Sequence, residues 1–378
     1  MARLFKTFFI SAIAFAHVQA CTSTAPKAAP DIPEFTSTLE AARLEDGAVG
    51  FATALIDDGE LIYAKGFGET ELGGGAPITP NHIFHWASVS KPLVATAIMQ
   101  LSERGQLSLD ANLVEILPDY RITDPRQRDI TIRQILLHTS GIPDVEDYNW
   151  DKPEYDEEAL MRWALTDSPR DLLFDPGTER KYSNVGYEIL GAVIERISGM
   201  SFEEYMSANI FEPLGMKSAS FIYPDTEKAL RTVGHAGARG EKHRIEHYPY
   251  NRRHGPSSTL NTSVMSFAPF AQALLAGGSL GETHVLNAET LADMWAPRWM
   301  IDEENAESGA MGWVVENRPG RARMVRHFGW DDGFRSALLL FPDTKQAVLF
   351  VTNDEDANLR AYLFPALDML KERASGEN

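Results

Sequence analysis

The segments of this chain that are predicted to be β-strands lie at its two ends, and the long middle is predicted to be helical. The predicted strands cover residues 49–56, 61–66, 322–328, 336–341 and 347–351. The first two form a hairpin around the turn Asp57-Asp58-Gly59. Helices are predicted over 34–44 and 357–373, and residues 101–265 are mainly helices and long loops. This order favours an α/β fold in which one antiparallel sheet, flanked by helices, joins distant segments and carries an inserted all-helical subdomain.

Length and composition bound the organisation of the chain. Its 378 residues, 44% of them hydrophobic, suffice for a large buried core. The formal net charge of −19 argues against a nucleic-acid partner, because phosphate binding depends on clustered Lys and Arg. We predict a signal peptide over 1–20, a flexible tether over 21–33, and one domain over 34–376. Within that domain, the α/β part covers about 34–100 and 280–376, and the helical part covers about 101–279.

The first twenty residues are typical of an export signal, with a basic start, a short apolar stretch and a small residue, Ala20, at the end. The apolar stretch is too short to span a bilayer. Cys21, the one cysteine of the chain, follows directly. Residues 18–21 resemble a bacterial lipoprotein signal whose cysteine becomes lipidated, although Gln19 is unusual there. The alternative is secretory cleavage at the same bond, which leaves a free thiol. Either way we predict an exported protein, periplasmic or membrane-anchored in a bacterium.

Ser88 and Lys91 stand three positions apart, just before the apolar run 93–101. On a helix, this spacing puts both side chains on one face. A serine hydroxyl becomes a good nucleophile when a neighbouring base takes its proton, and burial lowers the pKa of an amine enough for that task. Pro92 suits the first turn of a helix, which places Ser88 at the helix N-terminus. Alone, the pattern also fits a capping serine beside a solvated lysine.

Two later motifs remove that ambiguity, Tyr182-Ser183-Asn184 and His327-Phe328-Gly329. In the order Ser-x-x-Lys, Tyr-x-Asn and His-x-Gly, the three motifs resemble those of the serine β-lactamase and penicillin-binding-protein superfamily, most of all its class C β-lactamase and esterase branch. Further landmarks of that family stand in the same order: Leu136-Leu137-His138-Thr139-Ser140-Gly141, Phe174-Asp175-Pro176-Gly177 and Pro213-Leu214-Gly215-Met216. The resemblance covers nearly the whole chain after its first thirty or so residues. It implies an α/β sandwich plus a helical subdomain, with the active site in the cleft between them.

The resemblance also implies catalytic roles. Ser88 attacks a carbonyl group and forms an acyl-enzyme that water then hydrolyses. Lys91 and Tyr182 share the proton transfers, and the charge of Lys91 would lower the pKa of Tyr182 so that the phenol can act as a base. Asn184 would accept a hydrogen bond from Lys91 and donate one to a substrate amide oxygen.

The third motif is expected to form the substrate-binding edge. His327 would donate a hydrogen bond to Tyr182 or to substrate, and it would titrate near neutral pH. Gly329 would let a substrate lie along the strand without interference from a side chain. The backbone N–H groups of Ser88 and Trp330 would form the oxyanion hole. We expect no metal and no cofactor.

The chain departs from the β-lactamase pattern at this motif. His327 stands where β-lactamases usually carry lysine, and the bulky Trp330-Asp331-Asp332 stands where relatives often have small residues. Asp331 and Asp332 would repel a substrate carboxylate unless Arg335 neutralises them. A neutral ester, or a substrate with a free amine, therefore fits better.

Two further motif matches are rejected. Residues 277–281 fit the Gly-x-Ser-x-Gly nucleophile elbow, but a predicted helix over 267–276 precedes them, so we expect Gly277 to end that helix. Residues 243–247 fit a His-x-x-Glu-His zinc pattern, but Gly240 and Pro249 leave too little room for a helix. His138 is expected to support structure. Three nearby aromatic residues either line a pocket or simply pack: Tyr148, Trp150 and Tyr155.

The function predicted from the sequence is an exported serine hydrolase that cleaves ester or small amide bonds of a small molecule through an acyl-serine, most of all a carboxylesterase. The alternatives are a β-lactamase, a D-amino-acid-specific peptidase, and a slow penicillin-binding or peptidoglycan-recognising protein that does not turn over. No nucleic-acid partner is expected, and contact with a membrane is expected only through a lipid on Cys21.

Overall fold

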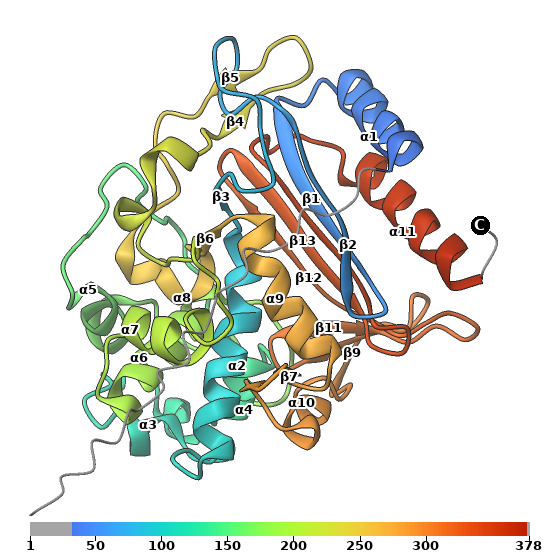
Figure 1. Cartoon of the computed structure of the whole chain (residues 1–378). Coiled ribbons are helices and arrows are strands. Elements are labelled where there is room, and N and C mark those ends of the chain that lie inside the picture. Colours follow the sequence, from blue (N-terminus) through green and yellow to red (C-terminus); the bar gives the residue numbers. More distant parts are fainter. Residues whose placement is uncertain (1–31, 376–378) are drawn as a thin grey trace, which may run out of the picture.

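The computed structural model describes residues 32–375 (Figure 1). The predictions for the signal peptide, for Cys21 and for the tether as far as residue 31 lie outside the described residues. Within them, no helix is both long and apolar enough to cross a membrane.

One eight-stranded sheet joins the two ends of the chain, in the order β2-β1-β14-β13-β12-β11-β10-β9. Its strands are β1 (Gly50–Asp57), β2 (Glu60–Gly68), β9 (Trp299–Asp302), β10 (Glu307–Ala310), β11 (Trp313–Glu316), β12 (Met324–Asp331), β13 (Phe334–Phe341) and β14 (Gln346–Thr352). Every neighbouring pair is antiparallel, and β1 pairs with β14 from Phe51 opposite Thr352 to Ile56 opposite Ala347. The predicted antiparallel sheet built from distant segments is therefore confirmed.

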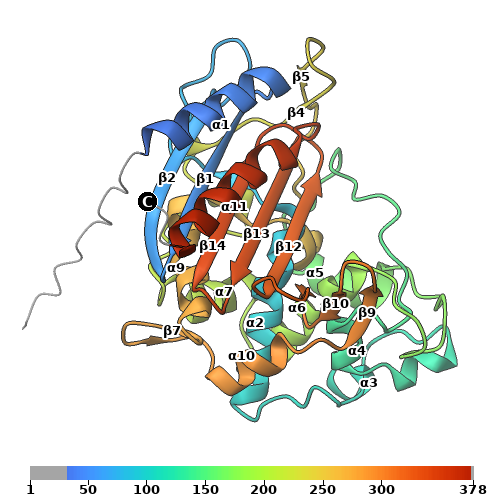
Figure 2. The same ribbon diagram turned by 90° about the vertical axis from the view of Figure 1, so that its right-hand side faces the viewer.

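Two helices cover one face of the sheet, α1 (Pro33–Asp46) and α11 (Leu359–Ser375), which lie side by side in Figure 2. The side chains of Phe51 and Leu55 alternate along β1 toward this layer. Phe51 packs with its ring centroid 5.3 Å from that of Phe350 and 4.7 Å from that of Tyr362. The intervening residues Ala52 and Ala54 face the opposite core. Because both faces are covered, the central strands are almost wholly apolar.

The other face carries the helical layer, whose main members are α2 (Ser90–Glu103), α6 (Asn184–Ser198) and α9 (Val264–Leu275). α2 is buried from Ser90 to Leu101, and it contacts α6. α9 packs against β1 and β14, although it falls in the segment predicted to form the helical part. The sheet is thus covered in part by a helix from the middle of the chain.

The remaining elements are short. The other α-helices are α3 (Leu113–Ile116), α4 (Ile132–Leu136), α5 (Ala159–Arg162), α7 (Phe202–Met206), α8 (Gly255–Ser258) and α10 (Ala288–Met294). The other strands form two-stranded pairs: β3 (Phe84–His85) with β6 (Asn261–Thr262), β4 (His235–Ala236) with β5 (His243–Arg244), and β7 (Ser279–Leu280) with β8 (Thr283–His284). Single 3-10 or π-helical turns cover η1 (Ala87–Val89), η2 (Pro125–Asp129), η3 (Trp163–Asp167), η4 (Ser207–Phe211), η5 (Tyr223–Asp225), η6 (Lys228–Leu230) and η7 (Arg252–His254).

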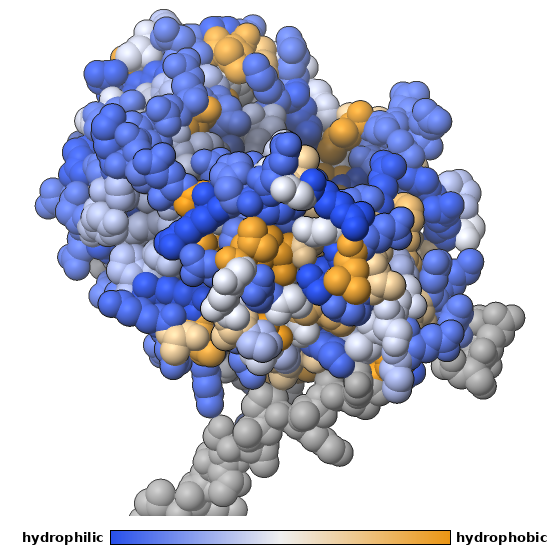
Figure 3. Space-filling view, turned by 90° about the horizontal axis from the view of Figure 1, so that it is seen from above, coloured by the Kyte–Doolittle hydropathy of each residue, from blue (hydrophilic) through white to orange (hydrophobic). Residues whose placement is uncertain are grey.

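Neither rejected motif has the local structure that its chemistry would need. Gly277 and Gly278 follow α9 with φ of +79° and +98°, and the Gly278 N–H donates to Ala273 O at 2.8 Å. These glycines therefore end a helix and do not follow a strand. His243 lies on the short strand β5, and so the zinc-protease pattern is not on a helix. From above, the surface is mostly hydrophilic, with hydrophobic residues in small separate groups (Figure 3).

Candidate active site

Ser88 lies on the 3-10 turn η1, two residues before α2 begins at Ser90. The sequence placed Ser88 at the N-terminus of the helix. In the structure it lies on the 3-10 turn that leads into the helix. Ala87 has φ of +48°, a conformation that costs a residue with a side chain about 1–3 kcal/mol. Two hydroxyl groups hold the turn: Ser90 Oγ donates to Ala87 O at 2.7 Å, and Ser336 Oγ donates to Trp86 O at 2.7 Å.

The Lys91 amine is completely buried against Ser88. Nζ lies 3.1 Å from Ser88 Oγ, 2.6 Å from Asn184 Oδ1 and 2.7 Å from the carbonyl oxygen of Ser257. Burial lowers the pKa of Lys91 to about 7, against the opposing effect of nearby carboxylates. A neutral amine has two N–H groups and one lone pair. The two acceptor oxygens take the N–H groups, which leaves the lone pair for the proton of Ser88.

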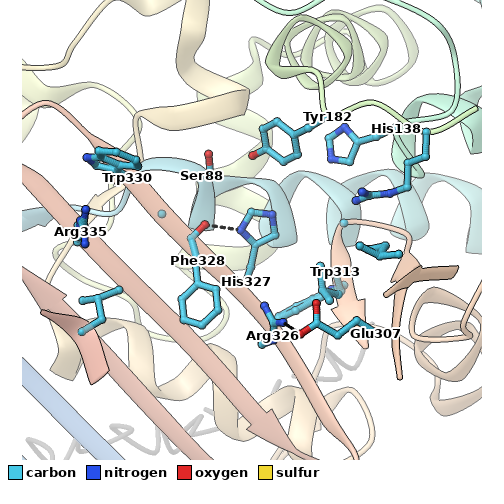
Figure 4. Close-up of a pocket in the computed structure, with 16 residues that line it drawn as sticks. Ser88, His138, Tyr182, Glu307, Trp313, Arg326, His327, Phe328, Trp330 and Arg335 are labelled. Carbon is cyan, nitrogen blue, oxygen red and sulfur yellow. Dashed lines mark hydrogen bonds and ion pairs between the residues drawn. The ribbon is translucent and has the colours of Figure 1, made fainter. Parts of the chain in front are cut away.

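Tyr182 also lies beside Ser88, with its phenol oxygen directed toward the serine (Figure 4). Burial raises the pKa of Tyr182 well above its usual value, and the hydrogen bond with Ser88 only partly opposes this. The Lys91 amine lies 4.8 Å from the centre of the phenol ring, yet it does not reverse the shift. The prediction of a lowered tyrosine pKa is therefore wrong. The phenol is neutral because desolvation outweighs the neighbouring charge, and it can donate or relay a proton.

His138 supports that phenol, as the sequence predicted. Its ring centroid lies 4.4 Å from that of Tyr182, and its Nδ1 accepts a hydrogen bond from the Ser183 N–H at 3.2 Å. Burial, followed by the charge of Arg180, lowers the pKa of His138 well below its usual value. The imidazole is thus a neutral wall of the site that fixes the position of the Tyr182 ring.

Asn184, the first residue of α6, connects Lys91 to a carboxylate that the sequence did not reveal. Its Oδ1 accepts from Lys91, while its Nδ2 donates to Asp144 Oδ1 at 3.1 Å and its backbone N–H donates to the same oxygen at 2.7 Å. The amide has a second N–H group, so its donation to a substrate stays a prediction, although Asn184 does not line the cavity beside Ser88. Asp144 lies in a loop 40 residues earlier, where nothing in the local pattern indicates its role.

A second carboxylate, the fully buried Glu188, lies on α6 one turn after Asn184. It accepts hydrogen bonds from Ser257 Oγ at 2.8 Å and from His254 Nδ1 at 2.7 Å. Ser257 is also the residue whose carbonyl oxygen accepts from Lys91. An acidic residue inside an otherwise apolar helix, four positions after Asn184, was a signal that could have identified Glu188 from the sequence.

His327 lines the cavity on β12 but does not titrate near neutral pH. Burial, helped by the charge of Lys91, lowers its pKa to about 3, so the prediction of a pH-sensitive histidine is wrong. Its Nδ1 lies 2.8 Å from the Phe328 carbonyl oxygen, which can only accept. The proton therefore sits on Nδ1, and Nε2 is left as a hydrogen-bond acceptor.

Gly329 is required for packing, and its role in letting a substrate lie along the strand stays a prediction. A Cβ atom there would lie 2.3 Å from Trp86 O and 2.3 Å from Ser336 Oγ. The missing side chain thus lets β12 pack against the turn that carries Ser88. The neighbouring Trp330 side chain is 66% exposed, and the Arg335 guanidinium lies 4.7 Å from the centre of its ring. The role of the Trp330 N–H in the oxyanion hole stays a prediction.

The cavity beside Ser88, which we call the catalytic cavity, has a volume of about 530 Å³. Its wall includes Ser88, Tyr182 and His327, with apolar side chains such as Trp313 and Phe328 (Figure 4). Three arginines and one glutamate supply its charged groups: Arg180, Arg326, Arg335 and Glu307.

The acidic pair that the sequence placed against a substrate carboxylate lies elsewhere. Asp331 points inward, with Oδ2 2.8 Å from His85 Nε2, and its side chain is only 10% exposed. Burial, followed by the charge of Asp331, raises the pKa of Asp332, which lines a different groove together with Trp150. Neither aspartate lines the catalytic cavity. The charge of Asp331 nevertheless acts on both Lys91 and Tyr182. The electrostatic exclusion of carboxylates therefore stays a prediction, and any repulsion would come from behind the cavity wall.

The aromatic residues left undecided mostly pack. The Tyr148 ring stacks on Trp150 at 4.6 Å, and both rings meet the buried His254 edge-on. Tyr155 is 57% exposed and lies near Tyr250. None of the three lines the catalytic cavity.

The fold and the site together define a serine hydrolase. Residues 35–367 match the family model described as Beta-lactamase, and the chain belongs to that family. It is 26% identical over 328 residues to penicillin-binding protein 4* of Bacillus subtilis (strain 168). This match covers 79% of this chain and 67% of that protein. It is 31% identical over 202 residues to esterase EstB of Burkholderia gladioli. That match covers 48% of this chain and 49% of the esterase. It therefore spans about two thirds of the first of these relatives, and the match to the second covers about half of it.

A solved structure agrees with the fold over most of the chain. The octameric penicillin-binding protein homologue from Pyrococcus abyssi superposes with a TM-score of 0.78 at 25% sequence identity. The match covers 90% of this chain and 77% of that one. The expected membership of the superfamily is confirmed.

Proposed function

We propose that this protein hydrolyses ester and small amide bonds through an acyl-serine intermediate, with carboxylic esters as its main substrates. The observation that carries the proposal is the buried Lys91 amine, whose contacts leave one lone pair beside Ser88 Oγ. An amine with a pKa of about 7 is neutral in half or more of the molecules at neutral pH, which suits a general base.

The reaction begins when Lys91 takes the proton of Ser88 and Oγ attacks the substrate carbonyl carbon. The negative charge that develops on the carbonyl oxygen is received by the N–H groups of Ser88 and Trp330, by analogy with the family. Tyr182 passes a proton to the leaving alcohol or amine as the bond to the carbonyl carbon breaks. Water then attacks the acyl-serine, and the same groups return the proton to Ser88.

Esters are favoured over β-lactams by the third motif. His327 is neutral and offers an acceptor at Nε2, where β-lactamases usually place a cationic lysine. The resemblance to an esterase over 202 residues points the same way. The cationic cavity wall does not by itself exclude D-amino-acid peptides or β-lactams, so these become arms of the test.

The test is a panel of chromogenic short-chain esters, D-amino-acid amides and a cephalosporin, with Ser88→Ala as the control. We expect multiple turnovers on esters, at kcat/KM at least tenfold above the other classes, and loss of all turnover in the variant. A faster reaction with the cephalosporin would reverse the assignment. Stoichiometric labelling of Ser88 without repeated cycles would show a binding protein instead of a hydrolase.

We also propose that the protein is exported and lipidated at Cys21, with peptidoglycan fragments among its candidate substrates. Export and lipidation are proposed from the sequence of residues 1–21 alone, and peptidoglycan fragments from the similarity to a penicillin-binding protein. Metabolic labelling with a fatty-acid analogue should mark the wild-type protein and not Cys21→Ala. If neither protein is labelled and both are released without a lipid, the result would instead support plain secretory cleavage.

A further inference from the structure

Glu188 is enclosed by hydrogen-bond donors in the interior of the helical layer. Its side chain is completely buried. Oε1 accepts from Ser257 Oγ at 2.8 Å and from His254 Nδ1 at 2.7 Å, and Oε2 accepts from Trp163 Nε1. An ionised carboxylate has only acceptors, so it matches a set of three donors. Because an unpaired carboxylate is costly in the interior of a protein, these three donors are what keep Glu188 there.

The direction of the hydrogen bond from His254 is fixed by its other ring nitrogen. Arg253 Nε donates to His254 Nε2 at 3.0 Å, and a guanidinium N–H can only donate. Nε2 therefore carries no proton, and the ring proton sits on Nδ1, where it faces Glu188. His254 is fully buried, and three aromatic rings pack edge-on against it. The imidazole is thus held as a donor to the carboxylate.

Glu188 connects the two groups that take the N–H groups of Lys91. One of them is Oδ1 of Asn184, which stands one turn before Glu188 on α6 and accepts from Lys91 Nζ at 2.6 Å. The other is the carbonyl oxygen of Ser257 on α8, which accepts from Nζ at 2.7 Å. The hydroxyl group of the same Ser257 donates to Glu188. The two acceptors therefore come from two helices, and Glu188 ties these helices together.

We propose that Glu188 is a positioning residue for the base: through Ser257 it fixes the carbonyl oxygen that receives one N–H group of Lys91, and so keeps the amine lone pair directed at Ser88. The role rests on the acyl-serine reaction proposed above. Glu188 does not line the catalytic cavity, so it acts on the reaction only through other residues. If the carbonyl oxygen moves, the amine turns about its terminal bond and the lone pair leaves the serine, and small displacements of this kind reduce catalysis strongly.

The charge of Glu188 also reaches Lys91. The carboxylates of Asp144, Asp331 and Glu188 favour the protonated amine, while burial opposes them more strongly. Two phenols and two imidazoles complete the titratable surroundings of the amine: Tyr182, Tyr187, His138 and His327. Burial keeps all four of these rings neutral. Loss of the Glu188 charge should therefore lower the pKa of Lys91 further.

The first experiment compares Glu188→Gln with wild type on 4-nitrophenyl acetate across pH. Glutamine keeps the size of the side chain but replaces one acceptor oxygen with a donor, which faces a set of donors. We expect kcat on the pH-independent plateau to fall about 10- to 100-fold, with KM within about threefold, as for a lost hydrogen bond to a charged group. The acid limb of kcat/KM should move to lower pH by about half a pH unit, which a loss of folded protein alone would not cause.

The matched control is Glu195→Gln, the same substitution seven positions further along α6. Glu195 accepts from the Phe202 N–H at 3.0 Å, and the helix rises about 10 Å between the two glutamates. We expect kcat and the acid limb of this variant to equal those of wild type.

The second experiment tests whether Glu188 acts through Ser257. Ser257→Ala removes the hydroxyl group and leaves the carbonyl oxygen, and we expect kcat to fall about tenfold, as for one lost hydrogen bond. The double variant should have kcat within about threefold of Glu188→Gln alone, because the same connection cannot be broken twice. Thermal unfolding checks that each variant folds. If Glu188→Gln does not fold, Ser257→Ala decides alone, and a kcat within about threefold of wild type would then reject the role.

Three results overturn the inference. They are a kcat within about threefold of wild type in folded Glu188→Gln, effects of the two substitutions that multiply, and an equal fall of kcat in Glu195→Gln.

A fluorophosphonate probe separates the inference from the proposed function. In its reaction Ser88 Oγ bonds to phosphorus, fluoride leaves, and the serine proton passes to Lys91. If the wild-type protein hydrolyses no ester, the esterase proposal fails, while the rate at which the probe labels Ser88, expected about tenfold lower in Glu188→Gln, still decides the role of Glu188. If the ester is hydrolysed and Glu188→Gln reacts with ester and probe at wild-type rates, the positioning role is wrong and the esterase proposal stands.

Discussion

Two basic side chains near Ser88, Lys91 and Arg180, differ in how their charge is compensated. Lys91 is fully buried, touches three oxygen atoms, and has a pKa of about 7. Arg180 is permanently charged and lacks any acceptor in the described chain. The first arrangement is complete before a substrate arrives, as proton transfer requires, whereas Arg180 has no hydrogen-bond partner within the described residues. Compensation of charge thus differs between the base and the cavity wall.

The largest effect is expected from removing the base, Lys91. Lys91→Met keeps the volume and the apolar packing but removes the base, and we expect kcat/KM on a short-chain ester to fall about 10³-fold or more. Lys152→Ala, at an exposed lysine, is the control and should be unchanged. A Lys91→Met enzyme with a tenth of wild-type activity would show that another group removes the serine proton.

A test of the scaffold comes next. Gly329→Ala forces a methyl group against Trp86 O and Ser336 Oγ, because a Cβ atom at this position would lie 2.3 Å from each of them. We expect a loss of about 1–3 kcal/mol in the free energy of unfolding, as for overpacking, and a fall in kcat of about 100-fold as the serine turn shifts. Gly74→Ala meets nothing within 4 Å and serves as the matched control. Unchanged kcat in Gly329→Ala would separate β12 packing from catalysis.

The pH dependence tests how the Lys91 pKa is set. The neutral amine is the active form, so kcat/KM should rise with pH through about 7. The carboxylate of Asp144 favours the protonated amine, and Asp144→Asn should therefore move this limb toward lower pH, by about one pH unit. His327, with a pKa of about 3, should add no limb above pH 5. A limb that moves upward would contradict the assignment of Lys91 as the base.

The same pKa predicts a stability profile. Because burial lowers the pKa of Lys91 from 10.5 to about 7, the unfolded chain binds more protons than the folded one between these values. The penalty for burying the amine is fully present below about pH 7 and declines as pH rises to 10.5. The stability of wild type relative to Lys91→Met should therefore increase across that window, as measured by urea unfolding at several pH values. A flat difference would mean that the amine is not desolvated.

The smallest effect is expected from a change in the charge of the cavity wall. Glu307→Gln removes the carboxylate that pairs with Arg326 and so makes the cavity wall more positive. We expect the preference for 3-acetoxybenzoate over its methyl ester to rise about two- to threefold, the scale of a partly exposed ion pair. A reduced preference would show that Glu307 positions Arg326 and does not screen it.

Much of the fold was predictable because it depends on local pattern. Strands were predicted over residues 49–56 and 347–351, and the structure has them at Gly50–Asp57 and Gln346–Thr352. The helix predicted at 34–44 is Pro33–Asp46. Ser88, Lys91 and Tyr182 could be found because their motifs are short and occur in a fixed order. The contacts of Asp144 could not, because loop position carries no information about which distant amide it meets.

The sequence alone determined the strand and helix segments, the three motifs, and the family to which the chain belongs. Only the tertiary structure decided the protonation states of Lys91, Tyr182 and His327, the inward turn of Asp331, and the lack of a partner for Arg180 within the described chain. The physical reason is that desolvation and charge pairing depend on every group packed around an atom, and those groups come from segments far apart in the chain.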